Sequence, residues 1–189
     1  MSVHPIESES FRILARRVDL SRRGPLARAV VARIVHATAD PEYARTVVAD
    51  EADLAAGVEA LRAGAAVVTD VEMVRHGITG VDARCYLPAV ADGTTRSAAG
   101  MRVAAGRHPE GAVFVVGCAP TALAELVRLH AAGEVEPALV VGLPVGFVGA
   151  AEAKEALRAS GMPAVSNVGE KGGSAVAAAA VNALVRLAC

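Results

Sequence analysis

Short, unbroken apolar runs alternate with helix-forming segments along most of the chain. The runs lie at 65–70, 112–117, 138–142 and 164–168, with a weaker one at 84–87, and a helical pattern follows each of them. Strands that are apolar on both faces are typical of a parallel sheet covered by helices on both sides. The sequence therefore predicts an α/β protein with three layers, α/β/α, around a mainly parallel sheet of five strands.

The length of the chain predicts one domain. Its 189 residues suffice for one sizeable core and are too few for two ordinary domains. We expect residues 1–189 to form this domain, with residues 1–24 as an N-terminal arm that packs on the body. Within this segment, residues 1–10 are expected to form a polar arm that leads into a short helix over residues 11–19.

Helix start and stop signals follow the arm. Pro25 begins a pattern of apolar residues at helical spacing, which predicts a helix that ends near His36. Asp40 and Pro41 predict the cap and first residue of another helix, and Asp50 the cap of a helix that ends at Gly64.

Composition limits the kinds of partner and compartment. Lys and Arg total 19 against 20 for Asp and Glu, which disfavours nucleic acid and membrane surfaces and favours a small ligand. Cys85, Cys118 and Cys189 form no CxxC pair, so we expect no disulfide framework, no metal site and a reducing, cytoplasmic setting. No targeting leader is expected. The alanine-rich run from Ser174 is interrupted by Asn182, which predicts a buried helix rather than a membrane span.

Three glycine-containing loops follow the predicted strands, at 117–121, 143–149 and 169–174. In a parallel sheet such loops gather at the carboxyl edge, where helix N-termini attract anions. The glycine spacing does not match the nucleotide fingerprints, so carboxylates are favoured over nucleotides as ligands. Thr121 and Ser174 would add hydroxyl donors. Gly172 and Gly173 indicate either close approach of a ligand or only a tight turn.

Two further residues are candidates for chemistry. His36 is expected at the edge of the buried face of its helix, facing a cleft, as an acid–base residue or else as a structural histidine. Arg96 follows Thr95 into the first turn of a predicted helix, where a cation opposes the helix dipole. A bound anion would explain that position, and so would a surface ion pair with a nearby Asp. The sequence shows neither a Ser-His-Asp order nor a zinc-type His-Glu pattern.

Together these motifs resemble the precorrin-8X methylmutase family over nearly the whole chain. The resemblance rests on IESESFRIL (6–14), RIVHATAD (33–40), DVEMVRHGIT (70–79), TRSAAGM (95–101), GCAPTAL (117–123), LPVGFVGAAEAK (143–154) and KGGSAVAAAAVNAL (171–184). It implies an α/β/α homodimer without a redox or nucleotide cofactor, and a pocket near the subunit interface for a polycarboxylate macrocycle. The family often has Asn before the Thr-Arg-Ser triplet and within the GNAPTAL loop, where this chain has Thr94 and Cys118.

The resemblance also implies an activity. Members of the family move a methyl group from carbon 11 to carbon 12 of precorrin-8X, described as a 1,5-sigmatropic rearrangement, to give hydrogenobyrinic acid in cobalamin biosynthesis. The matching histidine, His36, would be the proton donor. Arg96, Ser10 and Thr79 match positions that line the family's pocket and hydrogen-bond the substrate. Further substrate contacts are expected from the residues at the helix starts and loops, which are Thr95, Ser97, Thr121, Gly172, Gly173 and Ser174.

Three alternatives remain open at this point. The substrate could instead be cobalt-precorrin-8, with cobyrinic acid as the product. The chain could also be a tetrapyrrole carrier that catalyses nothing, or an α/β enzyme that binds a phosphorylated metabolite at the same helix ends.

Overall fold

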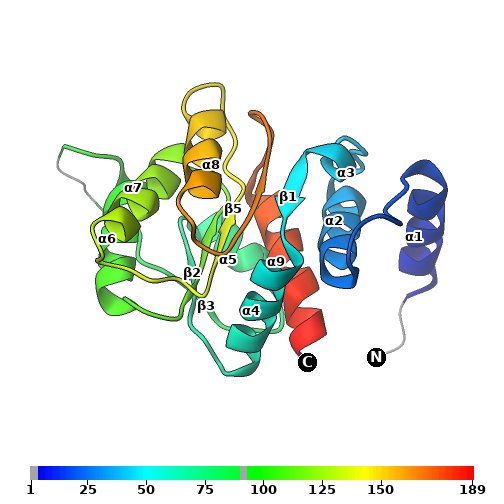
Figure 1. Ribbon diagram of the computed structural model, residues 1–189, viewed down its shortest axis with the longest axis horizontal. Coiled ribbons are helices and arrows are strands. Elements are labelled where there is room, and N and C mark those ends of the chain that lie inside the picture. The colour runs from blue at the N-terminus through cyan, green and yellow to red at the C-terminus, as the bar shows by residue number, and fades with distance from the viewer. Residues whose placement is uncertain (1–3, 90–92) are drawn as a thin grey trace.

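The computed structural model describes residues 4–89 and 93–189 (Figure 1). The helices of this part of the chain are α1 (Pro5–Arg17), α2 (Pro25–Thr38), α3 (Tyr43–Thr46), α4 (Glu51–Arg62), α5 (Glu72–Gly77), α6 (Arg96–Arg107), α7 (Pro120–Ala131), α8 (Ala150–Ala159) and α9 (Ser174–Ala188). The strands are β1 (Val47–Ala49), β2 (Val67–Thr69), β3 (Ala83–Cys85), β4 (Val113–Val116), β5 (Leu139–Gly142) and β6 (Ala164–Asn167).

The strands form a single sheet in the order β1-β6-β5-β4-β2-β3. The five predicted strands are confirmed, and neighbouring pairs among them are parallel. The prediction missed β1, which pairs antiparallel with β6 at the sheet edge and makes the sheet six-stranded. This strand has only three residues, too few for a period-two pattern to be distinguished from the helical signals on either side.

Side chains alternate across the sheet and build a core on each face. In β4, Val113 and Val115 join one apolar cluster, with α4 and α9, whereas Phe114 and Val116 join another, with α6, α7 and α8. The three-layer α/β/α architecture is thus confirmed. Figure 1 shows α2 beyond α4 and α9, and α1 beyond α2, so one side of the molecule carries two further helices.

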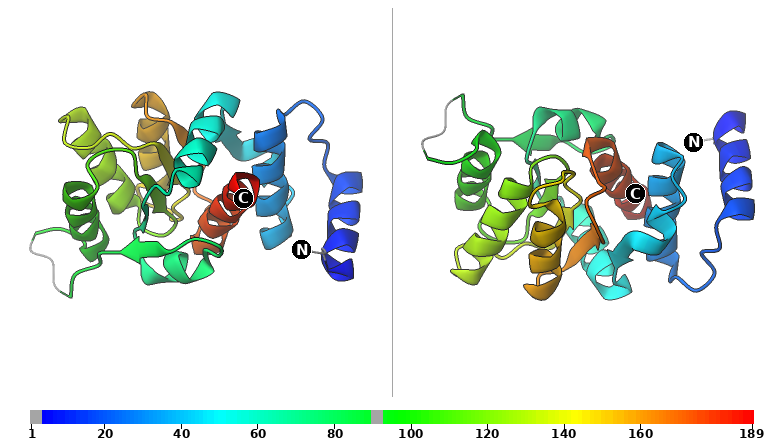
Figure 2. Two further views of the ribbon diagram at one scale, coloured as in Figure 1. Left: turned by 90° about the horizontal axis from the view of Figure 1, so that it is seen from below. Right: turned by 90° about the horizontal axis from the view of Figure 1, so that it is seen from above.

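Helix α1 begins earlier than predicted. The sequence indicated a helix only over residues 11–19, but α1 begins at Pro5, and Nδ1 of His4 accepts the Ile6 N–H at 3.2 Å. Proline suits the first helical turn, where its missing N–H costs nothing. None of the residues of α1 is buried. Figure 2 shows this helix beside α2 at the end of the molecule that lies away from α6.

Helix α2 carries His36 in its last turn, as predicted. Ala27, Val30, Val31, Ile34 and Val35 are buried at helical spacing. At its N-terminus the Glu51 carboxylate accepts the N–H groups of Leu26 and Ala27, at 2.7 and 3.1 Å. Glu51 therefore anchors the N-terminus of α2, and the buried face that extends to Val35 holds the last turn, with His36, against the body.

The helix predicted to start at Pro41 starts two residues later, because α3 begins at Tyr43 with Glu42 as its cap. Pro41 lies in a turn, and the Asp40 side chain accepts the N–H of Glu42 at 2.9 Å, so it closes that turn instead of capping a helix. The predicted cap at Asp50 is confirmed, since its carboxylate accepts the N–H of Ala52 at 2.8 Å. Asp-Pro and Asp-Glu pairs give similar local signals, and only the packing separates a turn from a helix start.

The C-terminal helix α9 is packed inside the molecule, as predicted, with residues such as Ala177, Ala180 and Leu184 fully buried. Within the described ranges no helix combines the length and apolar character needed to cross a membrane. Cys85, Cys118 and Cys189 are free thiols.

Candidate active site at the carboxyl edge of the sheet

His36 is half-buried and makes two defined contacts with α1. Its Nδ1 lies 2.8 Å from Oγ of Ser10, and its ring stacks on that of Phe11 with centroids 4.7 Å apart and planes inclined by 12°. Because the Ser10 hydroxyl engages Nδ1, Nε2 is the ring nitrogen available to a ligand.

Two hollows open beside His36. One, of about 110 Å³, lies between α1 and α2 and is bordered by Ser10 and Ile13. The other, of about 360 Å³, lies between α2, the end of α5 and α9, and is bordered by Gly77, Ala175 and Asn182. Small side chains on α9 leave this space free, so the histidine faces a cleft, as the sequence predicted.

Thr79 is held next to the second hollow by Asn182. The Asn182 Oδ1 accepts the backbone N–H of Thr79 at 2.8 Å, and its Nδ2 donates to the carbonyl of Gly77 at 2.9 Å. Both Gly77 and Asn182 line the hollow together with His36. The structure thus brings Ser10, Thr79 and His36, three of the predicted site residues, to one region.

The loop before α7 is fixed by a buried carboxylate. Asp70, at the end of β2, is only 2% exposed and accepts the backbone N–H groups of Gly117, Cys118 and Ala119 at 3.1, 2.9 and 2.8 Å. Burial raises the pKa of Asp70, while the three N–H donors act in the opposite direction. The loop that opens α7 therefore has a defined shape without a ligand.

The loop at 168–173 is fixed by a buried amine. Nζ of Lys154 donates to the carbonyl of Lys171 at 2.7 Å and to the Asn167 side chain at 3.1 Å. Burial lowers the pKa of Lys154 to about 8. The exposed ammonium of Lys171 contacts Asp40 and Glu42 at 2.7 and 2.8 Å, and these carboxylates hold its pKa above the usual range. The loop is thus also tied to the turn that follows α2.

The two glycines of this loop have structural reasons to be there. A Cβ on Gly172 would collide with the backbone carbonyl oxygens of Leu143 and Pro144. Gly173 has φ 130°, and its N–H donates to the Leu143 carbonyl at 2.9 Å. Ser174 is the first residue of α9, and the preceding glycine supplies no side-chain cap, so the first amides of the helix are accessible to a ligand.

Threonines join the starts of α6 and α7. Thr95 caps α6, because its Oγ1 accepts the N–H of Ala98 at 3.2 Å, and the same oxygen lies 2.7 Å from Oγ1 of Thr121 in the first turn of α7. Ser97 is half-buried in the first turn of α6. The Thr95–Thr121 contact thus joins the starts of α6 and α7 at the same edge of the sheet, although β2 lies between β3 and β4.

Arg96 has a different neighbour from the one expected. Its Nε donates to the carbonyl of Pro88 at 2.6 Å, not to a carboxylate. The side chain is exposed, and Arg96 is not among the residues that line the hollows beside His36. The structure thus places Arg96 with Thr95 and Thr121 at the helix starts, apart from the histidine.

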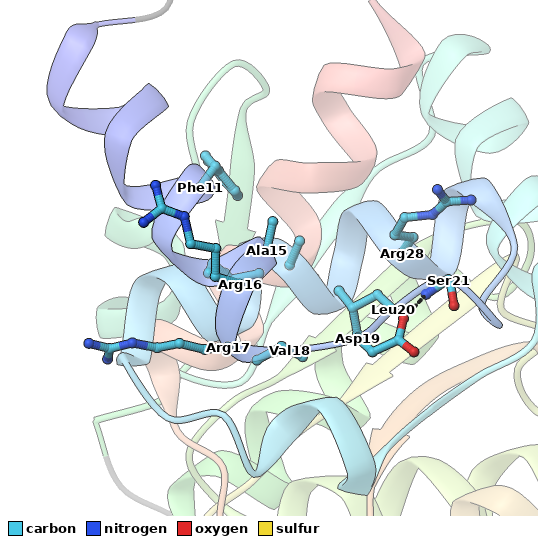
Figure 3. A pocket seen from close by; sticks show the side chains of 11 residues that line it. Phe11, Ala15, Arg16, Arg17, Val18, Asp19, Leu20, Ser21 and Arg28 are labelled. Atoms are coloured by element: carbon cyan, nitrogen blue, oxygen red, sulfur yellow. Dashed lines mark hydrogen bonds between the residues drawn. The ribbon is translucent and has the colours of Figure 1, made fainter.

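A further hollow, of about 640 Å³, runs along α1, the segment after it and α2 (Figure 3). Arg16, Arg17 and Arg28 border it together with Asp19, whose side chain accepts the N–H of Ser21 at 2.8 Å. His36 does not line this hollow, and neither does any other predicted site residue. The candidate site therefore remains at the cleft that His36 borders.

Four residues that shape the site were not predicted. Phe11 stacks on His36, and Asn182 borders the cleft beside it. Asp70 and Lys154 fix two of the loops. An asparagine inside an alanine-rich helix and a lysine within an otherwise buried helical face were available signals. Phe11 and Asp70 carry no local signal, because their partners lie far along the chain.

The fold and the site define a class: a three-layer α/β/α protein with a half-buried histidine beside a cleft and accessible helix N-termini at the carboxyl edge of its sheet. The profile of the family described as precorrin-8X methylmutase matches residues 5–187. This chain belongs to the precorrin-8X methylmutase family.

Relatives with two different names support this assignment. A cobalt-precorrin-8 methylmutase of Methanothermobacter thermautotrophicus is 46% identical over 89% of this chain and 84% of the relative. A precorrin-8X methylmutase of Pseudomonas aeruginosa is 48% identical over 69% of each chain. The solved structure of a precorrin-8X methylmutase from Thermus thermophilus superposes with a TM-score of 0.89 at 36% identity and covers 98% of both chains.

Proposed function

We propose that this chain isomerises precorrin-8X, moving the ring methyl group from carbon 11 to carbon 12 to give hydrogenobyrinic acid in cobalamin biosynthesis. The observation that carries the proposal is the geometry of His36: in a chain of this family, an imidazole is held at Nδ1 by Ser10 and borders a ligand cleft. The relatives with cobalt-precorrin-8 in their names support the cobalt-containing macrocycle as the alternative substrate.

In this proposal His36 acts as a general acid. The imidazolium donates the proton on Nε2 to the conjugated macrocycle, which draws electron density from the carbon that carries the methyl group. The methyl group then migrates within the ring, and the proton returns to the neutral imidazole. The Ser10 hydroxyl can accept from Nδ1–H both in the imidazolium and in the neutral imidazole that remains after Nε2 has given up its proton, so the contact persists through the step. A well-positioned acid typically accelerates such a step about 10²–10⁴-fold.

The remaining predicted residues are proposed to bind the substrate. The carboxylate arms of the macrocycle suit the accessible starts of α8 and α9, which have no side-chain cap. Arg96 would add a charge-assisted contact, and the hydroxyls of Thr95, Thr121 and Ser97 would add neutral ones. Thr79 and Ser174 would contact the ring nearer the histidine, with Gly172 and Gly173 permitting its close approach.

We also propose that the working form is a homodimer. A tetrapyrrole with its carboxylate arms needs a pocket near the upper end of the usual range of roughly 300–1,000 Å³, whereas the cleft beside His36 has about 360 Å³. The loop after β5 carries Val145, Phe147 and Val148, which are 46%, 93% and 88% exposed. Exposed apolar side chains beside the site favour a second subunit that completes the pocket.

The proposed compartment is the cytoplasm. Free cysteines are consistent with such a reducing compartment.

The test is a time course of the visible spectrum after the purified protein is mixed with metal-free precorrin-8X under anaerobic conditions. Migration of the methyl group changes the conjugation of the ring, so turnover appears as the spectrum of hydrogenobyrinic acid. Conversion of cobalt-precorrin-8 alone would establish the alternative substrate. A spectral shift without conversion of either macrocycle would instead identify a carrier.

A further inference from the structure

The aromatic ring that stacks on His36 has no assigned role. Phe11 lies on α1, one residue after Ser10, and its ring plane is inclined by only 12° to the imidazole, with centroids 4.7 Å apart. The adjacent hydroxyl meets Nδ1 at 2.8 Å. A hydrogen bond at one atom leaves the ring free to tilt about that bond. A flat contact over the ring face removes this freedom.

Phe11 contacts a residue of α2, and its helix α1 is tied to both α2 and α9. The Arg33 guanidinium lies 5.1 Å from the Phe11 ring centroid, a cation–π contact. Arg33 also bonds the carboxylate of Glu7 at 2.8 Å, with both side chains mostly buried, and the same oxygen of Glu7 contacts Arg186 at 3.1 Å. Glu7 and Phe11 are one helical turn apart on α1, so they present to the same side of the helix.

We propose that Phe11 is a positioning residue for His36. Stacking fixes the plane of the imidazole and, with the Ser10 contact, directs Nε2 toward the cleft lined by Gly77 and Asn182. Phe11 lines neither of the two hollows beside His36. It therefore acts on the reaction through the histidine. This inference rests on the proposed role of His36 as the acid.

The ring also suits the charge of the acid. An imidazolium is a flat cation, and the face of an aromatic ring attracts cations. The face of the Phe11 ring is therefore a suitable neighbour for the imidazolium that the proposed step uses. An aliphatic side chain of similar size would fill the space between α1 and α2 without supplying either the flat contact or the attraction.

The experiment is a double-mutant cycle with Phe11→Leu and His36→Ala, measured as kcat and KM for the macrocycle that the wild-type protein converts. We expect Phe11→Leu to lower kcat about tenfold, the size of one modest aromatic contact, with little change in KM. In the His36→Ala background the same substitution should have no further effect. In the wild-type background Phe11→Tyr, which keeps an aromatic ring, should retain most of kcat. Equal losses in both backgrounds, or a change in KM alone, would overturn the proposal.

Two control variants separate positioning from simple docking of α1. Glu7→Gln weakens the contacts with Arg33 and Arg186 but leaves the stacked ring in place, so we expect it to lower kcat less than Phe11→Leu does. Ile6→Ala alters a side chain of α1 that is 75% exposed and should leave kcat unchanged. If Glu7→Gln and Phe11→Leu lower kcat equally, docking of α1 rather than stacking is responsible.

The nuclear magnetic resonance signal of the His36 ring protons keeps this test distinct from that of the proposed function. Stacking on Phe11 shifts these resonances by ring current, and Phe11→Leu should remove the shift whether or not the protein turns over any macrocycle. A wild-type protein that converts neither macrocycle would defeat the proposed function. Unchanged His36 resonances in Phe11→Leu would defeat the positioning role.

Discussion

The two sides of the candidate site are held in place by different physical means. The loops that open α7 and α9 depend on Asp70, Lys154 and Asn167, side chains that are 2% exposed or less. His36 depends on α1, a helix without a buried residue, through one hydroxyl contact and one stacked ring. The loops are thus fixed by side chains in the core of the molecule, whereas the orientation of the histidine depends on a helix at the surface.

This difference has a consequence for mutation. A change in the loop supports alters buried hydrogen bonds, so stability and ligand binding should fall together. A change on the α1–α2 side breaks contacts that contribute little to the core, so it should lower turnover while the fold remains. Four variants at the loops and helix starts test this separation, from the largest expected effect to the smallest.

Gly172→Ala should produce the largest loss of stability. The new methyl group would collide with the carbonyl oxygens of Leu143 and Pro144, which belong to backbone and cannot rotate away. We expect the free energy of unfolding in urea to fall by about 3 kcal/mol, the upper end of typical overpacking costs. Gly106→Ala is the matched control, because Gly106 lies in the last turn of α6 and a Cβ there meets nothing within 4 Å. Equal stabilities of the two variants would contradict the account of this loop.

Arg96→Ala should weaken binding of the carboxylated macrocycle without unfolding the protein. Loss of one charge-assisted hydrogen bond corresponds to roughly tenfold lower affinity. In the structure the side chain contacts only the carbonyl of Pro88 among the described residues, so stability should change little. A fluorescence or absorbance titration measures the affinity. Unaltered affinity would remove Arg96 from the binding surface.

Lys154→Met should reveal a stability change with pH. The pKa of Lys154 is lowered by burial to about 8, whereas in the unfolded chain it is ordinary, at about 10.4. Between these values the unfolded chain binds more protons, so the stability of the wild-type protein relative to Lys154→Met should increase as pH rises through this window. Denaturant midpoints of both proteins at pH 7.5, about 9 and about 10.5 measure it. A constant difference would show that the amine is not buried as described.

Lys171→Ala should have the smallest effect, and the opposite dependence on pH. Lys171 is exposed, and its pKa is raised by Asp40 and Glu42, so its contribution is present below the ordinary lysine pKa and lost as pH rises beyond it. We expect a slight loss of stability at neutral pH that disappears at higher pH. A loss as large as that of Gly172→Ala would mean that this exposed contact, and not the buried lysine, holds the loop.

Local patterns in the sequence account for most of the fold. Apolar runs located the five strands buried between helices, and Pro25 and Asp50 located helix starts, since each of these signals acts within a few residues. The strand β1 and the true start of α1 were missed. β1 exists because Val47 to Ala49 find an edge partner in β6, more than a hundred residues later, and no local pattern reports such a pairing.

The site divides in the same way. His36, Ser10 and Thr79 could be located from motifs, and the structure places them around one region. The stacking of Phe11 on His36 could not be predicted, because residues 11 and 36 become neighbours only when α1 docks on α2. Likewise, the carboxylate that shapes residues 117–119 is that of Asp70, which follows β2 nearly fifty residues earlier in the chain.

The central claim is that binding and proton delivery belong to different sides of the site. It is tested most directly by measuring, for His36→Ala, both the affinity for the macrocycle and the rate of its spectral conversion. The account predicts affinity close to that of the wild-type protein and conversion that is slower by about 10²–10⁴-fold. Conversion at the wild-type rate would remove His36 from the reaction and contradict the account.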